Sequence, residues 1–366
     1  MKRWIIAVSL GIAAVLCMPN VYGEEPFSPV TPQEYAQWQN ALPAELREDT
    51  DSLPENGELM SILWEKTLSS LRQGWPSAAS LMTKLLGILM VCSVLTGCGS
   101  GLLTPGVTPA WELCITLCLA VSVTDTVYAL AGASERYLER MTSLANGVSP
   151  VVCAVAAASG KLSSAAAGRV SMMLLCAVLQ NTYVFFLFPT VKMAFCLGIA
   201  GNLGSTVRID ALSRLVRRIF LWVLAGLGLV LSFLIASQTW IARSADSLTF
   251  RTVKFALSSF IPLVGSSLAE ALGTAAGGLQ MIRQSCGILS AAGVLLYLLP
   301  TAAELLLHRL VLSLCQGAAE LLGCEREGKL LGEMHGIVGY MTAVVCVSSL
   351  LFLFVLILMM GVSGAG

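Results

Sequence analysis

The stretch that decides the fold is Ile337–Val362, IVGYMTAVVCVSSLLFLFVLILMMGV, which contains no charged residue. An α-helix needs about 20 consecutive apolar residues to cross the hydrocarbon core of a bilayer. A helix that is apolar on every side is either buried in a large protein core or surrounded by lipid. The sequence therefore predicts a membrane-spanning helix at this position.

Five other apolar stretches of spanning length precede this one. The six predicted spans are Leu85–Leu103, Trp111–Ala131, Val170–Phe188, Ile219–Trp240, Ser285–Leu307 and Ile337–Val362. Three shorter apolar stretches, predicted as re-entrant or interfacial helices, are Val148–Ala158, Thr190–Gly204 and Leu310–Leu322. Because helices satisfy their own backbone hydrogen bonds in lipid, the predicted fold class is all-α: a polytopic integral membrane helical bundle with about six spans.

The composition of the whole chain agrees with this fold class. Of 366 residues, 56% are apolar and 12% are charged, and the mean hydropathy is +0.79. Soluble domains are about 25% charged, so this chain lacks half of the charge that a water-exposed surface needs. No cluster of basic residues is large enough to indicate nucleic-acid binding, and a lipid bilayer is the predicted surrounding.

The amino terminus has the features of a secretory signal peptide, predicted over residues 1–23. Lys2 and Arg3 precede the short apolar stretch Trp4–Met18, and cleavage is predicted between Gly23 and Glu24. Residues 24–80 are predicted as an acidic extracytoplasmic segment with an amphipathic helix, and residues 81–366 as the multi-pass transmembrane domain. An uncleaved signal anchor is the alternative for the first segment.

The extracytoplasmic segment has two parts. Glu24–Glu58 carries nine acidic residues, one basic residue and five prolines, a composition typical of a loosely ordered chain. In Leu59–Arg72, apolar residues recur at helical spacing, which indicates an amphipathic helix that lies on the membrane or on a partner.

Basic residues predict the orientation of the spans. With the acidic segment outside, the cations expected on the cytoplasmic side are Arg208, Arg214, Arg217, Arg218, Arg309, Arg326 and Lys329. This distribution follows the tendency of cytoplasmic loops to be rich in Lys and Arg. The segment Ile241–Gln284 is then external although it also carries basic residues, which weakens the assignment.

The stretch Ser244–Leu272 is the strongest candidate for a functional element. Arg251 and Lys254 share one face of a predicted helix, opposite an apolar face, and Pro262 must kink or end that helix. Gly265 follows as a natural stop. One interpretation is an interfacial helix whose cations meet lipid phosphates; the other is a kinked re-entrant hairpin that lines a water-filled path.

Polar residues inside predicted spans are further candidates for pore or partner contacts. Asp125 and Glu304 lie near span ends, where they could face a cavity or reach the lipid headgroups. Gln180 and Asn181 lie at the centre of their span, where hydrogen bonds between helices are a more common role than pore lining.

Motifs that carry catalysis or hold a cofactor are absent from the sequence. His308 and His335 lack the spacing of a metal site, and no Walker A, GxGxxG or GxSxG motif occurs. Most cysteines lie in apolar runs, so we interpret them as packing residues and predict no metal site. The predicted protein is not an enzyme and binds no cofactor.

Two runs, RSADSLTFRTVKFA (Arg243–Ala256) and FIPLVG (Phe260–Gly265), resemble the signature region of the stage III sporulation protein AE family. Asp246, Arg251, Lys254, Pro262 and Gly265 carry the most specific part of this resemblance. It implies a membrane subunit of a channel or secretion-like complex that links mother cell and forespore. It also implies partners among the other stage III subunits, a place in the mother-cell membrane around the forespore, and a role in forespore development and late forespore gene expression.

Two other function classes fit the same sequence. A secondary transporter with its own substrate site would show related halves and broken helices in corresponding positions, and the short elements keep this alternative open. A structural membrane anchor for partner subunits would need no polar residues facing a cavity. Paired glycines such as Gly97 and Gly101 favour tight helix packing and self-association into a homo-oligomer.

Overall fold

The computed structural model describes residues 32–47, 56–102, 108–158, 162–203, 212, 214–229 and 265–361. These residues are helical except for short connections at 42–43 and 322–324, and no strand occurs among them. The helices are α2 (Pro32–Ala41), α3 (Ala44–Arg47), α4 (Asn56–Leu102), α5 (Thr108–Ala158), α6 (Leu162–Thr182), the π-helical turn η1 (Tyr183–Leu187), α7 (Phe188–Leu203), a helix over 214–229, α9 (Gly265–Leu321) and α10 (Glu325–Gly361). The predicted all-α class is confirmed.

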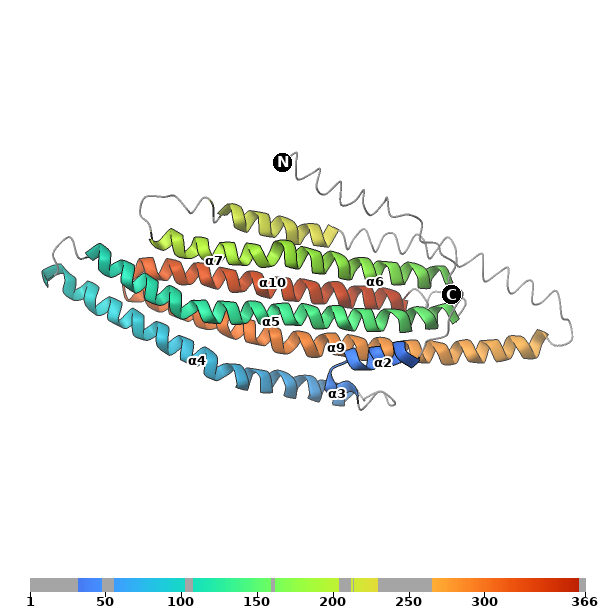
Figure 1. Ribbon diagram of the computed structural model, residues 1–366. Helices are drawn as coiled ribbons and strands as arrows, with labels where there is room; N and C mark the ends of the chain where they lie inside the picture. Colours follow the sequence, from blue (N-terminus) through green and yellow to red (C-terminus); the bar gives the residue numbers. More distant parts are fainter. Residues whose placement is uncertain are drawn as a thin grey trace, which may run out of the picture.

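The long helices lie side by side as an elongated bundle (Figure 1). The long helices alternate in direction along the chain, with α6, η1 and α7 forming one continuous helix. α10 is packed among α9, α5 and α7. α5 has 51 residues, so at 1.5 Å per residue it is about 77 Å long. Because the hydrocarbon core of a bilayer is only about 30 Å thick, an upright helix of this length would extend well beyond it.

Four described helices contain segments long and apolar enough to cross a membrane: Met60–Leu95, Ala110–Ala154, Cys286–Leu321 and Glu325–Ile357. The predicted span Val170–Phe188 coincides with a shorter apolar helix, Met172–Thr182. The predicted span Ile219–Trp240 is described only up to residue 229. A count of about six spans therefore stays a prediction.

The three short apolar stretches are not isolated helices, and their prediction as re-entrant or interfacial helices is not confirmed. Val148–Ala158 is the end of α5, Leu310–Leu322 overlaps the end of α9, and Thr190–Gly204 overlaps α7, which follows α6 without a loop. The polar residues that interrupt these runs, such as Glu135–Arg140 in α5, still favour helix. They change the polarity of the surface without ending the helix.

A π-helical turn accommodates Pro189 between α6 and α7. Proline has no N–H for the helix and clashes with the carbonyl one turn earlier, so it usually kinks or ends a helix. Tyr183–Leu187 widens into a π-helix directly before it, an insertion that is common where a helix is perturbed. Thr190 Oγ1 donates to the Phe186 carbonyl at 2.5 Å, which supplies a donor close to the proline.

Helices α2 and α3 are docked onto the bundle, so the prediction of a loosely ordered acidic segment is wrong for residues 32–47. Trp38, Leu42 and Leu46 are buried. Trp38 Nε1 donates to Ser290 Oγ of α9 at 3.2 Å. Tyr297 Oη donates to the Ala41 carbonyl at 3.2 Å. These three buried apolar residues anchor the segment although its composition is acidic.

Gly147 of α5 permits this docking, and its replacement is a sharp test of it. A Cβ atom at Gly147 would lie 3.1 Å from Trp38 Cα and 3.3 Å from the Gln37 carbonyl oxygen. Gly147→Ala is therefore expected to destabilise the docked helices by about 1–3 kcal/mol. Hydrogen exchange of residues 32–47 in detergent measures this change.

The matched control for Gly147→Ala is Gly87→Ala in α4, where a Cβ atom would meet no described atom within 4 Å. There the replacement is expected to stabilise the helix by about 0.5–1 kcal/mol, because alanine favours helix over glycine. Equal effects of the two variants would contradict the docking of α2 against Gly147.

Candidate functional site at the polar end of the bundle

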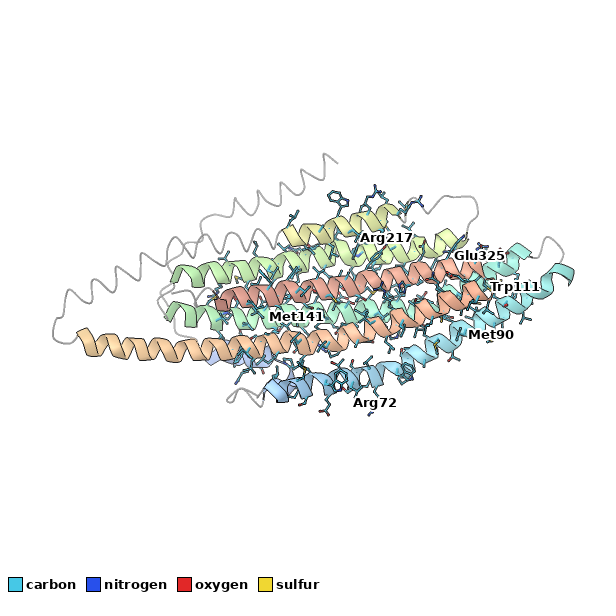
Figure 2. All side chains as sticks on the ribbon, turned by 180° about the vertical axis from the view of Figure 1, so that it is seen from behind. Arg72, Met90, Trp111, Met141, Arg217 and Glu325 are labelled. Atoms are coloured by element: carbon cyan, nitrogen blue, oxygen red, sulfur yellow. The ribbon has the colours of Figure 1, made fainter. Side chains whose placement is uncertain are left out.

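Charged side chains gather at one end of the bundle, which we call the polar end. There α4, α7 and α9 finish and α5, the helix over 214–229 and α10 begin (Figure 1). Figure 2 shows Glu325 and Trp111 toward this end, and Arg217 and Arg72 on opposite sides of the bundle. The described cations that the sequence assigns to the cytoplasmic side, among them Arg214 and Arg326, therefore lie on elements that meet at one end.

A tight turn between α9 and α10 builds the centre of the polar end. Gly323 adopts a left-handed conformation with φ 73°, which glycine takes without steric cost. Its N–H donates to the Glu320 carbonyl at 3.3 Å, and the Cys324 N–H donates to the Ala319 carbonyl at 2.9 Å. This pattern is a Schellman motif. It reverses the chain and places the charged first turns of α10 at the end of the bundle.

A hollow of about 870 Å³ opens beside this turn. We call it the cationic crevice. Its charged lining consists of Arg214, Arg217, Arg326, Lys329, Glu325 and Glu333. The other lining residues include Asn202, Gln316 and Tyr340. Four cations against two carboxylates give the crevice a positive balance. It is built from α7, 214–229, α9 and α10, so it exists only when these helices are packed together.

Arg326 connects three helices at the edge of the crevice. Its Nη1 donates to Glu112 Oε2 of α5 at 2.9 Å, and its Nε donates to the Asn202 carbonyl of α7 at 2.6 Å. Both ionised side chains of the pair are partly exposed, so the ion pair contributes only about 0–1 kcal/mol. The planar guanidinium nevertheless fixes the position of α10 relative to α5 and α7.

The two histidines take part in helix contacts rather than in a metal site. Arg309 Nε donates to His335 Nε2 at 3.2 Å, and His335 Nδ1 lies 3.1 Å from the Arg309 carbonyl. Because Nε2 accepts, Nδ1 carries the proton and donates to that carbonyl. His308 Nδ1 lies 2.9 Å from the Glu304 carbonyl of its own helix. The contacts between Arg309 and His335 link α9 to α10 next to the crevice.

A second polar hollow, of about 410 Å³, lies along α5 and includes the predicted residue Gln180. Its lining is Gln37, Glu139, Thr142, Ser143, Asn146, Gly147 and Gln180. It therefore borders the docked helix α2. Asp125 and Asn181, two other candidates, have exposed side chains and line neither of these hollows.

The remaining predicted site residues fall at or beyond the edge of the described structure. Asp246, Arg251, Lys254 and Pro262 lie outside the described residues. Gly265, predicted as a helix stop, is the first residue of α9. The structure therefore leaves the role of this stretch as a prediction.

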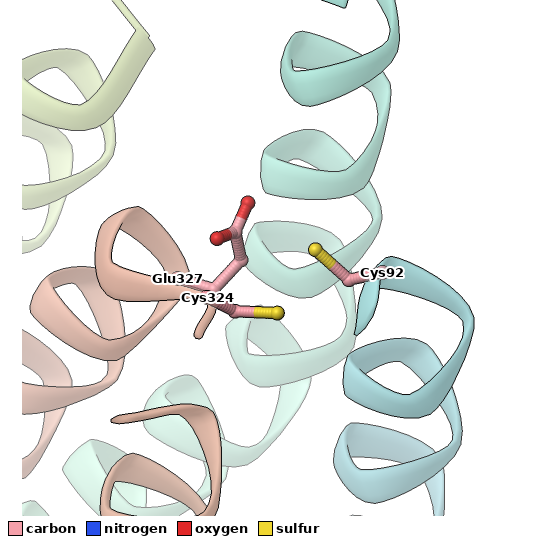
Figure 3. Close-up of side chains that lie close together, drawn as sticks. All are labelled: Cys92, Cys324 and Glu327. Carbon is pink, nitrogen blue, oxygen red and sulfur yellow. The ribbon is translucent and has the colours of Figure 1, made fainter. Parts of the chain in front are cut away.

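Among the described residues, one cluster of side chains could hold a metal ion. The sulfur atoms of Cys92 and Cys324 and a carboxylate oxygen of Glu327 all lie within 4.8 Å of one another, and all three residues are buried. Figure 3 shows Cys92 on α4 facing Cys324 and Glu327, which belong to the turn and first residues of α10. Sequence reasoning missed this cluster because Cys92 and Cys324 are far apart in the chain. The one signal was that Cys324 has charged neighbours.

Comparison with known proteins gives one family. The family described as stage III sporulation protein AE matches residues 54–363. Stage III sporulation protein AE of Bacillus subtilis (strain 168) is 23% identical over 234 residues, which cover 64% of this chain and 59% of the relative's length. No solved structure matches. The resemblance predicted from Arg243–Gly265 is confirmed at the level of the family.

Proposed function

The chain belongs to the stage III sporulation protein AE family, and from this premise we propose that it is a non-enzymatic membrane subunit of a sporulation complex. The complex is a channel or secretion-like apparatus between mother cell and forespore. It supports forespore development and late forespore gene expression. The chain lies in the mother-cell membrane around the forespore, behind a cleaved signal peptide.

The cationic crevice is the observation that carries this proposal. A subunit of an assembly needs a surface that recognises another subunit, and the crevice offers positive charge inside a hollow formed by several helices. Complementary charge steers partners together and fixes their register. We propose that an acidic segment of another stage III subunit docks there.

The outer surface of the bundle supports the membrane part of the proposal. Large apolar side chains are exposed on several helices, including Val121 of α5, Phe185 of η1 and Leu350 of α10. Apolar surface of this extent is covered by lipid or by other proteins.

Removing two cations of the crevice tests the proposed docking. Arg214→Gln combined with Arg217→Gln keeps polar side chains but removes positive charge from the helix over 214–229. The double variant is expected to lower spore yield at least about tenfold, because loss of paired charge at an interface costs about 2–5 kcal/mol. Spore counts and co-purification of other stage III subunits from sporulating cells measure the effect.

Arg72→Gln is the matched control, since Arg72 is exposed on α4, on the opposite side of the bundle from Arg217 (Figure 2), and does not line the crevice. It is expected to leave spore yield and co-purification unchanged. Cysteine labelling of both variants checks that the topology is retained. A double variant that sporulates normally and retains its partners would rule out the crevice as the docking surface.

A further inference from the structure

A buried cluster of two thiols and a carboxylate joins α4 to the turn between α9 and α10. The three potential ligand atoms lie within 4.8 Å of one another (Figure 3). We propose that Cys92, Cys324 and Glu327 form a binding site for a soft divalent cation, best suited to zinc.

Glu327 contributes a buried carboxylate to this cluster. Only 4% of its surface is exposed. Its carboxylate lies beside the Cys92 and Cys324 thiols, with one oxygen within 4.8 Å of both sulfur atoms. Buried carboxylates in proteins are usually paired with a cation or coordinated to a metal. A cation between the carboxylate and the two thiolates would supply that pairing.

Glu327 is not required to cap the N-terminus of α10. Its position three residues after Cys324 is that of the acidic residue in a capping box, which accepts from the backbone N–H of the cap residue. Here the Cys324 N–H donates to the Ala319 carbonyl at 2.9 Å as part of the Schellman motif. The carboxylate is therefore not needed to cap α10, and its place beside the thiols requires another explanation.

The spacing of the three atoms fits a tetrahedral zinc site. Zinc–sulfur bonds of about 2.3 Å and zinc–oxygen bonds of about 2.1 Å place the ligand atoms roughly 3.5–3.8 Å apart. The observed limit of 4.8 Å is about 1 Å larger, a difference that small side-chain rotations close. Thiolates select soft or borderline cations such as zinc over magnesium and calcium. The fourth position would be taken by solvent.

The ligands come from the end region of α4 and from the α9–α10 turn, so a bound ion would clamp two elements that are far apart in sequence. Glu327 directly follows Arg326, which lines the cationic crevice and holds α5 and α7. The ion would therefore hold the polar end together. This inference does not depend on the proposed role in sporulation, because it concerns the isolated chain.

Metal content of the purified protein tests the proposal. The full chain, carrying an affinity tag without histidine or cysteine, is purified in detergent, exposed to zinc and freed of unbound metal. About one zinc ion per chain is expected. Cys92→Ser and Cys324→Ser are expected to lose it. Cys286→Ser is expected to keep it, since Cys286 is also buried but is not among the three ligands.

Two further measurements keep the proposal falsifiable if a cysteine variant fails to fold. Glu327→Gln preserves size and is expected to weaken zinc affinity at least about tenfold in competition with a chromophoric chelator. Cobalt bound in place of zinc should show a thiolate-to-cobalt charge-transfer band that Cys286→Ser retains. Equal zinc content in wild type and Glu327→Gln, or a disulfide between Cys92 and Cys324 in protein taken directly from cells, would overturn the proposal.

Discussion

Trp38→Ala is expected to release α2 and α3 from the bundle. The Trp38 side chain is 1% exposed, and its indole N–H donates to Ser290 Oγ on α9. Truncation of a buried tryptophan costs about 3–5 kcal/mol. Because every 1.4 kcal/mol is a factor of ten, hydrogen-exchange protection of residues 32–47 should fall by at least about a hundredfold in detergent.

Trp64→Ala is the matched control for this experiment. Trp64 is the same residue type on α4, but its side chain is 70% exposed. Its truncation leaves no cavity, so the protection of residues 32–47 should stay as in the wild type. If both variants lose protection equally, or if Trp38→Ala loses none, then α2 is not anchored through Trp38.

The docked segment shows where sequence reasoning was misled. Nine acidic residues and five prolines between Glu24 and Glu58 indicate disorder by composition. Trp38, Leu42 and Leu46 follow one another at helical spacing within that stretch. That pattern could have been recognised, but the surface that receives it is formed by α5 and α9, whose packing the sequence does not reveal.

For the long helices, the sequence predicted the positions correctly but not the ends. Apolar runs such as Trp111–Ala131 were located correctly, because runs of that length have few alternatives. The sequence did not predict that the helices continue beyond these apolar runs. α5 passes through Glu135–Arg140 and Pro150 as one helix, although a change of polarity and a proline both predict a boundary. The pattern of apolar and polar residues indicates whether a helix faces lipid, protein or water. It does not indicate where the helix ends.

At the candidate site, the sequence identified the individual residues but did not predict that they lie close together. The sequence identified Arg214, Arg217, Arg326 and Lys329 as cations of the cytoplasmic side. Only the antiparallel packing of two pairs of helix ends, α7 with 214–229 and α9 with α10, brings them around one hollow. Cys92 and Cys324 illustrate the same limit, since no spacing rule connects residues that distant.

The largest functional effect is expected from Arg251→Ala combined with Lys254→Ala. These cations lie outside the described residues, in the stretch that resembles the signature of the family. If they line a path or contact a partner, the double variant should block sporulation while the chain still accumulates in the membrane. Immunoblots of membrane fractions and spore counts test both parts. Two cations that only meet lipid contribute roughly 1 kcal/mol each, a loss that the remaining apolar helices would tolerate.

A charge-retaining exchange separates these two interpretations. Attraction to lipid phosphates needs only positive charge, so Arg251→Lys with Lys254→Arg should then sporulate normally. A bidentate contact with a partner carboxylate needs the planar guanidinium, so the exchange should fail, and Arg251→Lys alone should fail with it. Lys254→Arg alone serves as the control because it leaves Arg251 in place. Normal spore counts for both the alanine pair and the exchange would show that Ser244–Leu272 only rests on the membrane, and would remove Arg251 and Lys254 from the candidate site.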